Sequence, residues 1–190
     1  MIRSAISFLV FLLLLSSCKE TYTPKPRGYI RIEPPEAKYA TLDEELPYSF
    51  SVSQWAVVEL PPVDSAAYWI NIDYPALNAK IYCSYRSITQ SSLDVHMEEC
   101  RRLVERAVRN ADVISEKVYE SRNDNVYGVL FQIEGESASP VQFVLTDSVL
   151  HFFRGAFYYK YNPNRDSVAP ITDYIKKDII ELIQTFYWRD

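Results

Sequence analysis

Residues 126–160 read VYGVLFQIEGESASPVQFVLTDSVLHFFRGAFYYK, and this segment decides the fold class of the chain. It holds three apolar runs, Val126–Ile133, Val141–Thr146 and Val149–Lys160, which are separated by polar turns. Parallel neighbours in a sheet need crossover connections of about a dozen residues or more, and these turns are too short for that. The segment therefore predicts three strands in an antiparallel meander.

The regions on either side add strands and two helices. Alternation of apolar residues with Ser49, Ser51 and Ser53 predicts a strand over residues 48–53. Further strands are expected at residues 55–60, 68–72, 79–86 and 113–119. Apolar residues at helical spacing predict one helix over residues 91–111 and a second between Ser167 and Tyr187. This order predicts an α+β fold with an antiparallel sheet of about six to seven strands, flanked by two main helices. The arrangement resembles the α-β-α sandwich of the Mog1/PsbP type, which is a likeness of fold alone.

The N-terminus has the three parts of a secretory signal in order. Arg3 supplies a positive charge, residues 8–15 are apolar, and Leu15-Ser16-Ser17-Cys18 ends the segment. The apolar run is far shorter than the about 20 residues of a membrane-spanning helix. Leu-Ser-Ser-Cys resembles a bacterial lipobox, in which the cysteine is acylated and the chain is cut before it. We therefore expect residues 1–17 to be a signal peptide and Cys18 to be lipidated. The alternative is an ordinary signal peptide with an incidental cysteine.

Composition divides the rest of the chain into a tether and one domain. Residues 18–46 are rich in proline and charge, which favours an extended tether. Residues 47–190 are expected to form a single globular domain, because the chain is 48% hydrophobic and 14% aromatic. The net charge of −5 argues against a nucleic-acid partner and against electrostatic attachment to anionic lipid. Membrane contact would therefore come from the acylated Cys18.

Cysteine and histidine usage predicts little chemistry. Cys83 and Cys100 have two readings: one disulfide in an oxidising periplasm, or two small buried apolar side chains. His96 and His151 lie in no metal-ligand spacing. The sequence contains no GxSxG, P-loop or GxGxxG motif, and Ser148 is typical of a serine in a turn. We therefore expect no catalytic residues, no metal and no cofactor, and a protein that is not an enzyme.

Two clusters combine arginine with aromatic side chains, which are enriched at protein interfaces. The first lies in the tether, and the second lies on the last predicted strand. The residues expected to bind a partner are Arg27, Tyr29, Arg31, Phe153, Arg154 and Phe157. Successive strand residues face opposite sides of a sheet, so part of the second cluster must belong to the core.

Short motifs along the chain resemble one protein family. They are PKPRGY (24–29), PYSF (47–50), WINIDYP (69–75), LTDS (145–148), HFFRGA (151–156) and DSVAP (166–170). Their sequence and order closely resemble the GldD gliding-motility lipoproteins of the Bacteroidota. The resemblance implies a cell-envelope lipoprotein needed for gliding and for the associated type IX secretion apparatus, without known enzymatic activity. Its implied partners are other gliding-motility lipoproteins and components of the secretion apparatus.

The location and the mode of action have alternatives at this point. Lys19, which follows the predicted acylated cysteine, favours the outer membrane, with the domain facing the periplasm. The main hypothesis is an anchored accessory protein that binds other envelope proteins. The alternative is a periplasmic lipoprotein that binds a glycan or a lipid. A concave apolar pocket on the order of several hundred Å³ would favour the small ligand. A flat aromatic–arginine surface would favour the protein partner.

Overall fold

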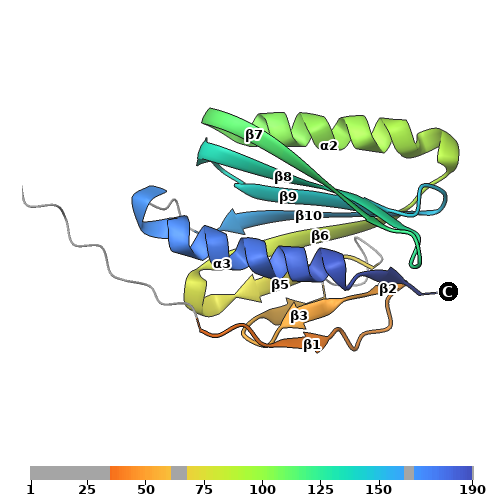
Figure 1. Cartoon of the computed structure of the whole chain (residues 1–190), viewed down its shortest axis with the longest axis horizontal. Coiled ribbons are helices and arrows are strands. Elements are labelled where there is room, and N and C mark those ends of the chain that lie inside the picture. The colour runs from red at the N-terminus through yellow and green to blue at the C-terminus, as the bar shows by residue number, and fades with distance from the viewer. Residues whose placement is uncertain (1–34, 61–67, 161–164, 190) are drawn as a thin grey trace, which may run out of the picture. The chain divides into compact units, whose positions relative to one another are not determined.

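The computed structural model describes residues 35–60, 68–160 and 165–189 (Figure 1). The predicted signal peptide, the lipidation site Cys18 and the tether residues Arg27, Tyr29 and Arg31 lie outside these ranges. The expectations stated for them therefore stay predictions.

The domain is built around a seven-stranded sheet, counted over the described residues. Its strands in spatial order are β4 (Val57–Glu59), β5 (Ile70–Tyr74), β6 (Ala79–Ser87), β10 (His151–Tyr159), β9 (Val141–Thr146), β8 (Val126–Ser137) and β7 (Val108–Ser121). All neighbouring pairs are antiparallel. The meander predicted over residues 126–160 is confirmed, and it extends back through β7. The pairing of β6 with β10 joins this meander to the earlier strands of the chain.

Two helices cover opposite faces of this sheet. They are α2 (Leu93–Ala107) and α3 (Arg165–Gln184), and two 3-10 helices, η1 (Pro75–Leu77) and η2 (Gln90–Ser92), occur in the connections. Cys100 and Val104 of α2 pack in one core with Phe152, whereas Ile175 of α3 packs in another core with Phe153. Phe152 and Phe153 are successive residues of one strand, so the two cores lie on opposite faces of the sheet. Figure 1 shows α3 lying across the sheet, which completes the predicted α+β fold with helices on both sides.

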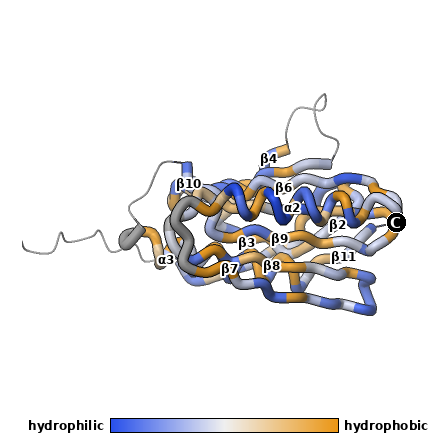
Figure 2. The backbone as a smooth tube through the Cα atoms, turned by 90° about the horizontal axis from the view of Figure 1, so that it is seen from above, coloured by the Kyte–Doolittle hydropathy of each residue, from blue (hydrophilic) through white to orange (hydrophobic). Residues whose placement is uncertain are grey.

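The helices combine polar and apolar residues. Figure 2 shows hydrophilic and hydrophobic residues alternating along α2, whose buried side chains are Cys100, Val104 and Ala107. This helix ends at Ala107, before the predicted end at residue 111, because the β-branched Val108 starts β7 in an extended conformation. Over the described part of the chain, no helix combines the length and the apolar character needed to cross a membrane.

Four short strands complete the core on the α3 side. They are β1 (Tyr39–Thr41), β2 (Tyr48–Ser49), β3 (Ser51–Ser53) and β11 (Tyr187–Trp188), which pair as β1–β3 and β2–β11. Leu42 and Leu46, which lie between β1 and β2, are buried in the same core. The Arg189 guanidinium donates a hydrogen bond of 3.1 Å to the carbonyl oxygen of Leu42. The domain therefore includes residues from Tyr39 onward, and the predicted boundary at residue 47 is wrong because the core buries apolar side chains of residues 39–46.

Aromatic rings fill the centre of the α3-side core. The Phe153 ring centroid lies 4.6 Å from that of Tyr48 and 5.3 Å from that of Phe186. Phe50 stacks on Phe186 at 5.9 Å between ring centroids. These rings come from the start of the domain, from the meander and from the segment after α3. The cluster therefore ties together parts of the chain that are far apart in sequence.

Candidate functional site

The face of the sheet beside α2 is only partly covered. The core under α2 is formed with β8, β9 and β10, whereas Tyr82 of β6 and Trp69, which directly precedes β5, are exposed on the same face. Tyr82 is 48% exposed and Trp69 is 38% exposed. Tyr82 meets Tyr158 edge to face, with 5.8 Å between ring centroids. We call the surface formed by Trp69, Asn71, Tyr82, Ser84 and Tyr158 the open face.

Hydrogen bonds and ion pairs fix the residues in and around the open face. The indole nitrogen of Trp69 donates a hydrogen bond of 2.9 Å to a backbone carbonyl oxygen of β6. Lys80 forms an ion pair of 2.8 Å with Glu59, and Lys160 forms one of 2.9 Å with Asp73. The charged groups at this edge of the sheet therefore neutralise each other, and the open face itself is aromatic and polar.

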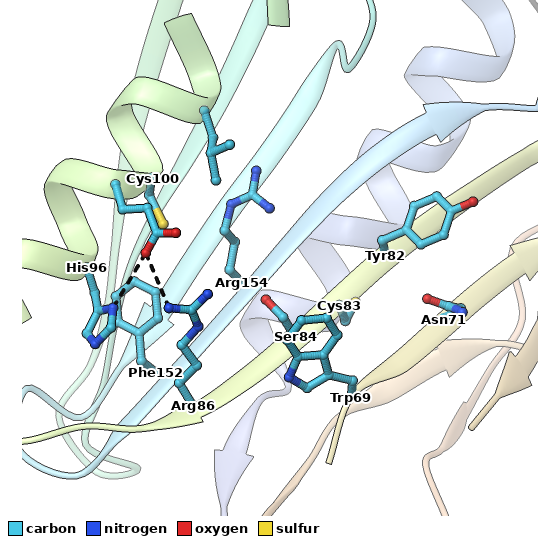
Figure 3. Close-up of a pocket in the computed structure, with 12 residues that line it drawn as sticks. Trp69, Asn71, Tyr82, Cys83, Ser84, Arg86, His96, Cys100, Phe152 and Arg154 are labelled. Carbon is cyan, nitrogen blue, oxygen red and sulfur yellow. Dashed lines mark hydrogen bonds and ion pairs between the residues drawn. The ribbon is translucent and has the colours of Figure 1, made fainter. Parts of the chain in front are cut away.

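A pocket of about 220 Å³ lies where the open face meets α2 (Figure 3). It is lined by Trp69, which precedes β5, by Tyr82, Arg86 and Arg154 from the sheet, and by His96 and Glu99 from α2. Figure 3 shows the two arginine side chains between the helix and the indole ring of Trp69. The pocket therefore combines aromatic walls with a cluster of charged groups.

The charges of this pocket do not balance. The Glu99 carboxylate accepts a hydrogen bond of 3.3 Å from Arg86 and lies 3.7 Å from Nδ1 of His96. Arg154 donates a hydrogen bond of 2.6 Å to Oε1 of Gln142. Two guanidinium groups thus face one carboxylate, so the pocket carries an excess of positive charge and is suited to an anionic group.

The Asp147-Ser148 turn forms a hydrogen-bond network with a structural role. Oδ1 of Asp147 accepts hydrogen bonds from the backbone N–H groups of residues 149–151. Burial opposes ionisation, yet these three donors hold the pKa of Asp147 below its ordinary value. His151 shares a hydrogen bond of 2.7 Å with the Tyr85 hydroxyl instead of contacting the carboxylate as a catalytic base would. The described residues also contain no group of three His, Cys, Asp or Glu side chains that could hold a metal ion.

A family model described as gliding motility lipoprotein GldD matches residues 19–188 of the chain. The chain belongs to the GldD family of gliding motility lipoproteins. Membership makes it a membrane-anchored protein of the cell envelope with a role in gliding motility. No match was found among curated proteins.

Among solved structures, this GldD-family chain is similar to a cyanobacterial protein. The solution structure of cyanobacterial PsbP (CyanoP) from Synechocystis sp. PCC 6803 has 11% sequence identity to it and a TM-score of 0.49. The match covers 86% of this chain and 99% of the cyanobacterial chain. The α+β class of the GldD-family domain follows from its own strand order and from the helices on both faces of its sheet.

The GldD-family structure separates the residues predicted to bind a partner on β10. Phe153 and Phe157 are fully buried in the α3-side core, so the prediction that they contact a partner is wrong. Arg154 points to the opposite face of the strand and lines the pocket. The physical reason is the alternation of side chains along a strand, which sends Arg154 away from its aromatic neighbours. Of these three residues, Arg154 is the one at the candidate site.

Cys83 and Cys100 are free thiols, so the disulfide weighed for them is not formed. Cys83 on β6 packs in the α3-side core, whereas Cys100 on α2 packs in the core of the other face. The sheet lies between the two side chains, and a disulfide needs the two Cβ atoms to approach within about 3.5–4.5 Å. Burial raises the pKa of Cys83, and it raises the pKa of Cys100 to about 11. Both therefore remain protonated, small and buried at neutral pH.

Sequence patterns alone do not identify Trp69, Arg86 and His96 as site residues. Arg86 falls on the polar side of the alternating pattern of β6, where a residue is expected to face solvent. His96 falls on the polar side of the predicted helix, yet its ring lies 5.5 Å from that of Phe152 between centroids. The pairing of β5 with β6, and of β6 with β10 next to α2, brings these residues together. Because that pairing joins distant segments, no local signal indicates it.

Proposed function

We propose that this protein is an accessory component of the gliding-motility machinery and of the associated type IX secretion apparatus. It acts by binding other envelope proteins, including further gliding-motility lipoproteins, and these proteins dock on the open face. Acylated Cys18 holds it at the outer membrane, with the domain facing the periplasm. Membership of the GldD family supports the role in gliding motility, and the open face supports the mode of action.

The observation that carries this mode of action is the exposure of Trp69 and Tyr82 on one sheet surface. Both side chains are more than a third exposed although they belong to a packed domain. Aromatic and arginine side chains are enriched at interface centres, because they bury a large area with few rotatable bonds. The open face is aromatic and has Arg86 in the adjoining pocket. This is the pattern expected for a surface that binds a protein.

The alternative, a lipoprotein that binds a glycan or a lipid, has less support. The pocket between the open face and α2 has a volume of about 220 Å³, and a hollow of about 670 Å³ along α2 is lined by charged side chains at five of its seven residues. Small-molecule sites usually have about 300–1,000 Å³ and mostly apolar walls with a few polar groups. In the pocket, four of the twelve lining residues are arginine, histidine or glutamate, namely Arg86, His96, Glu99 and Arg154. A pocket of this size and polarity suits one side chain of a docked protein better than a sugar chain or an acyl chain.

Photo-crosslinking in cells tests the docking surface. A photo-reactive amino acid replaces Tyr82 in the full-length lipoprotein, and a matched variant carries it at Tyr187 of β11, which is 38% exposed outside the open face. We expect crosslinks to envelope proteins from position 82 and not from position 187. Equal yields from both positions, or no crosslink from position 82, would contradict the proposal.

A charge placed on the open face tests whether docking matters for function. Tyr82→Lys puts an ammonium group on the docking surface and, at an exposed position, should leave the fold intact. We expect it to reduce gliding and the secretion of type IX substrates, whereas Tyr187→Lys should leave both unchanged. Normal secretion and normal gliding in Tyr82→Lys would show that the cell does not use this surface.

A further inference from the structure

Arg154 is the charged group of the pocket that has no counter-ion among the described residues. Arg86 and His96 share the Glu99 carboxylate at 3.3 Å and 3.7 Å. Arg154 instead donates a hydrogen bond of 2.6 Å to the neutral amide oxygen of Gln142. The side chain is half-buried, and loss of water around a charge is costly when no opposite charge offsets it. The pocket is therefore incomplete without a negative group.

Two more nitrogen atoms in and beside the pocket have no hydrogen-bond partner among the residues that the structure describes. They are the amide nitrogen of Gln142, a residue that is 1% exposed, and the buried Nδ1 of His96. A guanidinium group has five N–H donors in a planar fork, which matches a carboxylate through two parallel hydrogen bonds. The bond from Arg154 to Gln142 uses one of the five. The N–H donors of Arg154 and Gln142 thus outnumber the acceptors that they reach, and an oxygen acceptor would satisfy them.

Charge and size favour a carboxylate over a phosphate. The two guanidinium groups and the Glu99 carboxylate leave one net positive charge, and a singly charged carboxylate balances it. A phosphate group carries about −1.5 to −2 at pH 7 and would place its second charge near Glu99. The volume of about 220 Å³ suits one side chain. The rings of Trp69 and Tyr82 border the pocket and offer contact to the apolar atoms of an entering side chain.

We propose that this pocket receives an aspartate or glutamate side chain of the protein docked on the open face, and that Arg154 binds its carboxylate through paired hydrogen bonds. The inference rests on the proposed function, since it defines the chemistry of the partner surface. The partner presents an acidic residue next to an apolar or aromatic one, which packs on Trp69 and Tyr82. Arg86 keeps its contact with Glu99.

Titration with charged and neutral dipeptides tests the acidic contact. The full-length protein in detergent micelles, isotope-labelled in its arginine and tryptophan side chains, is titrated with acetyl-Phe-Glu-amide and followed by NMR. We expect the Nε–H signal of Arg154 and the Nε1–H signal of Trp69 to shift. Acetyl-Phe-Gln-amide, which has nearly the same shape and no charge, should shift neither signal. Equal shifts with both dipeptides, no shift with either, or tighter binding of inorganic phosphate would overturn the inference.

A pair of arginine variants gives the size of the effect. Arg154→Gln should weaken binding of acetyl-Phe-Glu-amide at least about 10-fold, as expected for the loss of hydrogen bonds to a charged group. Arg102→Gln is the matched control, because Arg102 lies on α2 in an exposed ion pair with Glu98. It should leave binding unchanged. Equal affinities of Arg154→Gln and the parent protein would refute the role of Arg154.

Crosslinking separates this inference from the proposed function. The photo-reactive residue at position 82 is combined with Arg154→Gln and, in a second strain, with Arg154→Lys, which keeps the charge. We expect the crosslink yield to fall strongly with Arg154→Gln and less with Arg154→Lys. An unchanged yield with Arg154→Gln would overturn the acidic contact and leave the docking function standing. Absence of crosslinks without any arginine substitution would overturn the docking function, whatever the dipeptides do.

Discussion

Gly155 shows how closely the strands of the meander pack on the α3 side. It lies on β10, directly opposite Phe143 on β9 and Cys83 on β6. A Cβ atom at this position would overlap Cε1 and Cζ of the Phe143 ring. That ring is fully buried and packs on Phe153, with 6.0 Å between ring centroids. The ring therefore has little space into which it can move.

Gly155→Ala should consequently lower the free energy of unfolding by about 2–3 kcal/mol, the upper part of the range for overpacked cores. In a domain of this size, each kcal/mol corresponds to a decrease in Tm of about 2–4 °C. Phe143→Leu removes the ring that the new methyl group meets. The decrease in unfolding free energy of the double variant should therefore be smaller than the sum of the decreases in the two single variants. The difference should be at least about 1 kcal/mol, because the two residues are in contact.

Urea denaturation of the four proteins, followed by circular dichroism, measures this double-mutant cycle. Val104→Ala supplies a control, since Val104 packs in the core on the opposite face of the sheet. The decreases in unfolding free energy caused by Val104→Ala and by Gly155→Ala should be additive to within about 0.5 kcal/mol in the variant that carries both. A Gly155→Ala protein as stable as the parent, or strictly additive losses for Gly155 and Phe143, would refute the packing argument.

Three further predictions concern the two faces, the thiols and a buried carboxyl group. Phe153→Ala should cost about 3–5 kcal/mol because it empties a buried site, whereas Tyr82→Ala should change stability by less than about 0.5 kcal/mol. Similar losses in urea titrations would contradict the assignment of the faces. Cys83 and Cys100 should resist iodoacetamide in the folded, unreduced protein and react fully after denaturation. Thiols that stay blocked in denaturant without a reductant would instead indicate a disulfide. Burial raises the pKa of Asp178, so the stability that it contributes is complete below its unfolded pKa of about 3.9 and is lost as the pH rises through the higher folded value. Asp178→Asn, which cannot ionise, should therefore gain stability relative to the parent protein from about pH 4 upward. If the unfolding free energies of Asp178→Asn and the parent protein differed by the same amount at every pH, the predicted role of Asp178 ionisation would be wrong.

The meander could be predicted because its signals are local. Each apolar run ends at turn residues, and a short connection permits only an antiparallel neighbour. The bounds of β9, Val141–Thr146, agree with the prediction. β10 begins at His151 and not at Val149, because the Asp147 carboxylate accepts hydrogen bonds from the backbone N–H groups of residues 149–151 and thereby holds residues 149 and 150 in a turn.

The role of each face of β10 could not be predicted from its sequence. Both faces of this strand carry buried aromatic residues, such as Phe152 and Phe153. The reason is that β10 is an inner strand with a layer of the protein packed on each side. Alternation separates Arg154 from Phe153, yet it does not say which of them reaches the surface. That depends on how far α2 extends across its side of the sheet, which is a tertiary feature.

The start of the domain escaped prediction because its partners lie at the other end of the chain. Tyr187 pairs with Ser49, and Arg189 binds the carbonyl oxygen of Leu42 across 147 residues. The surrounding prolines and charges are typical of a tether. Leu42 and Leu46 are too few to indicate a strand by periodicity, so the contacts that bury them are visible only in the folded chain.

The open face follows from the widths of helices and strands. Neighbouring strands lie about 4.8 Å apart, so seven of them span about 29 Å. A helix with its side chains is about 10–12 Å wide, and it covers about two strands. On the α3 side, the short strands β1, β2, β3 and β11 add to the helix and fill the remaining width. On the α2 side, no described segment does this over β5 and β6. Side chains on this part of the sheet must either be polar or be covered by another protein. The exposure of Trp69 and Tyr82 favours a covering protein.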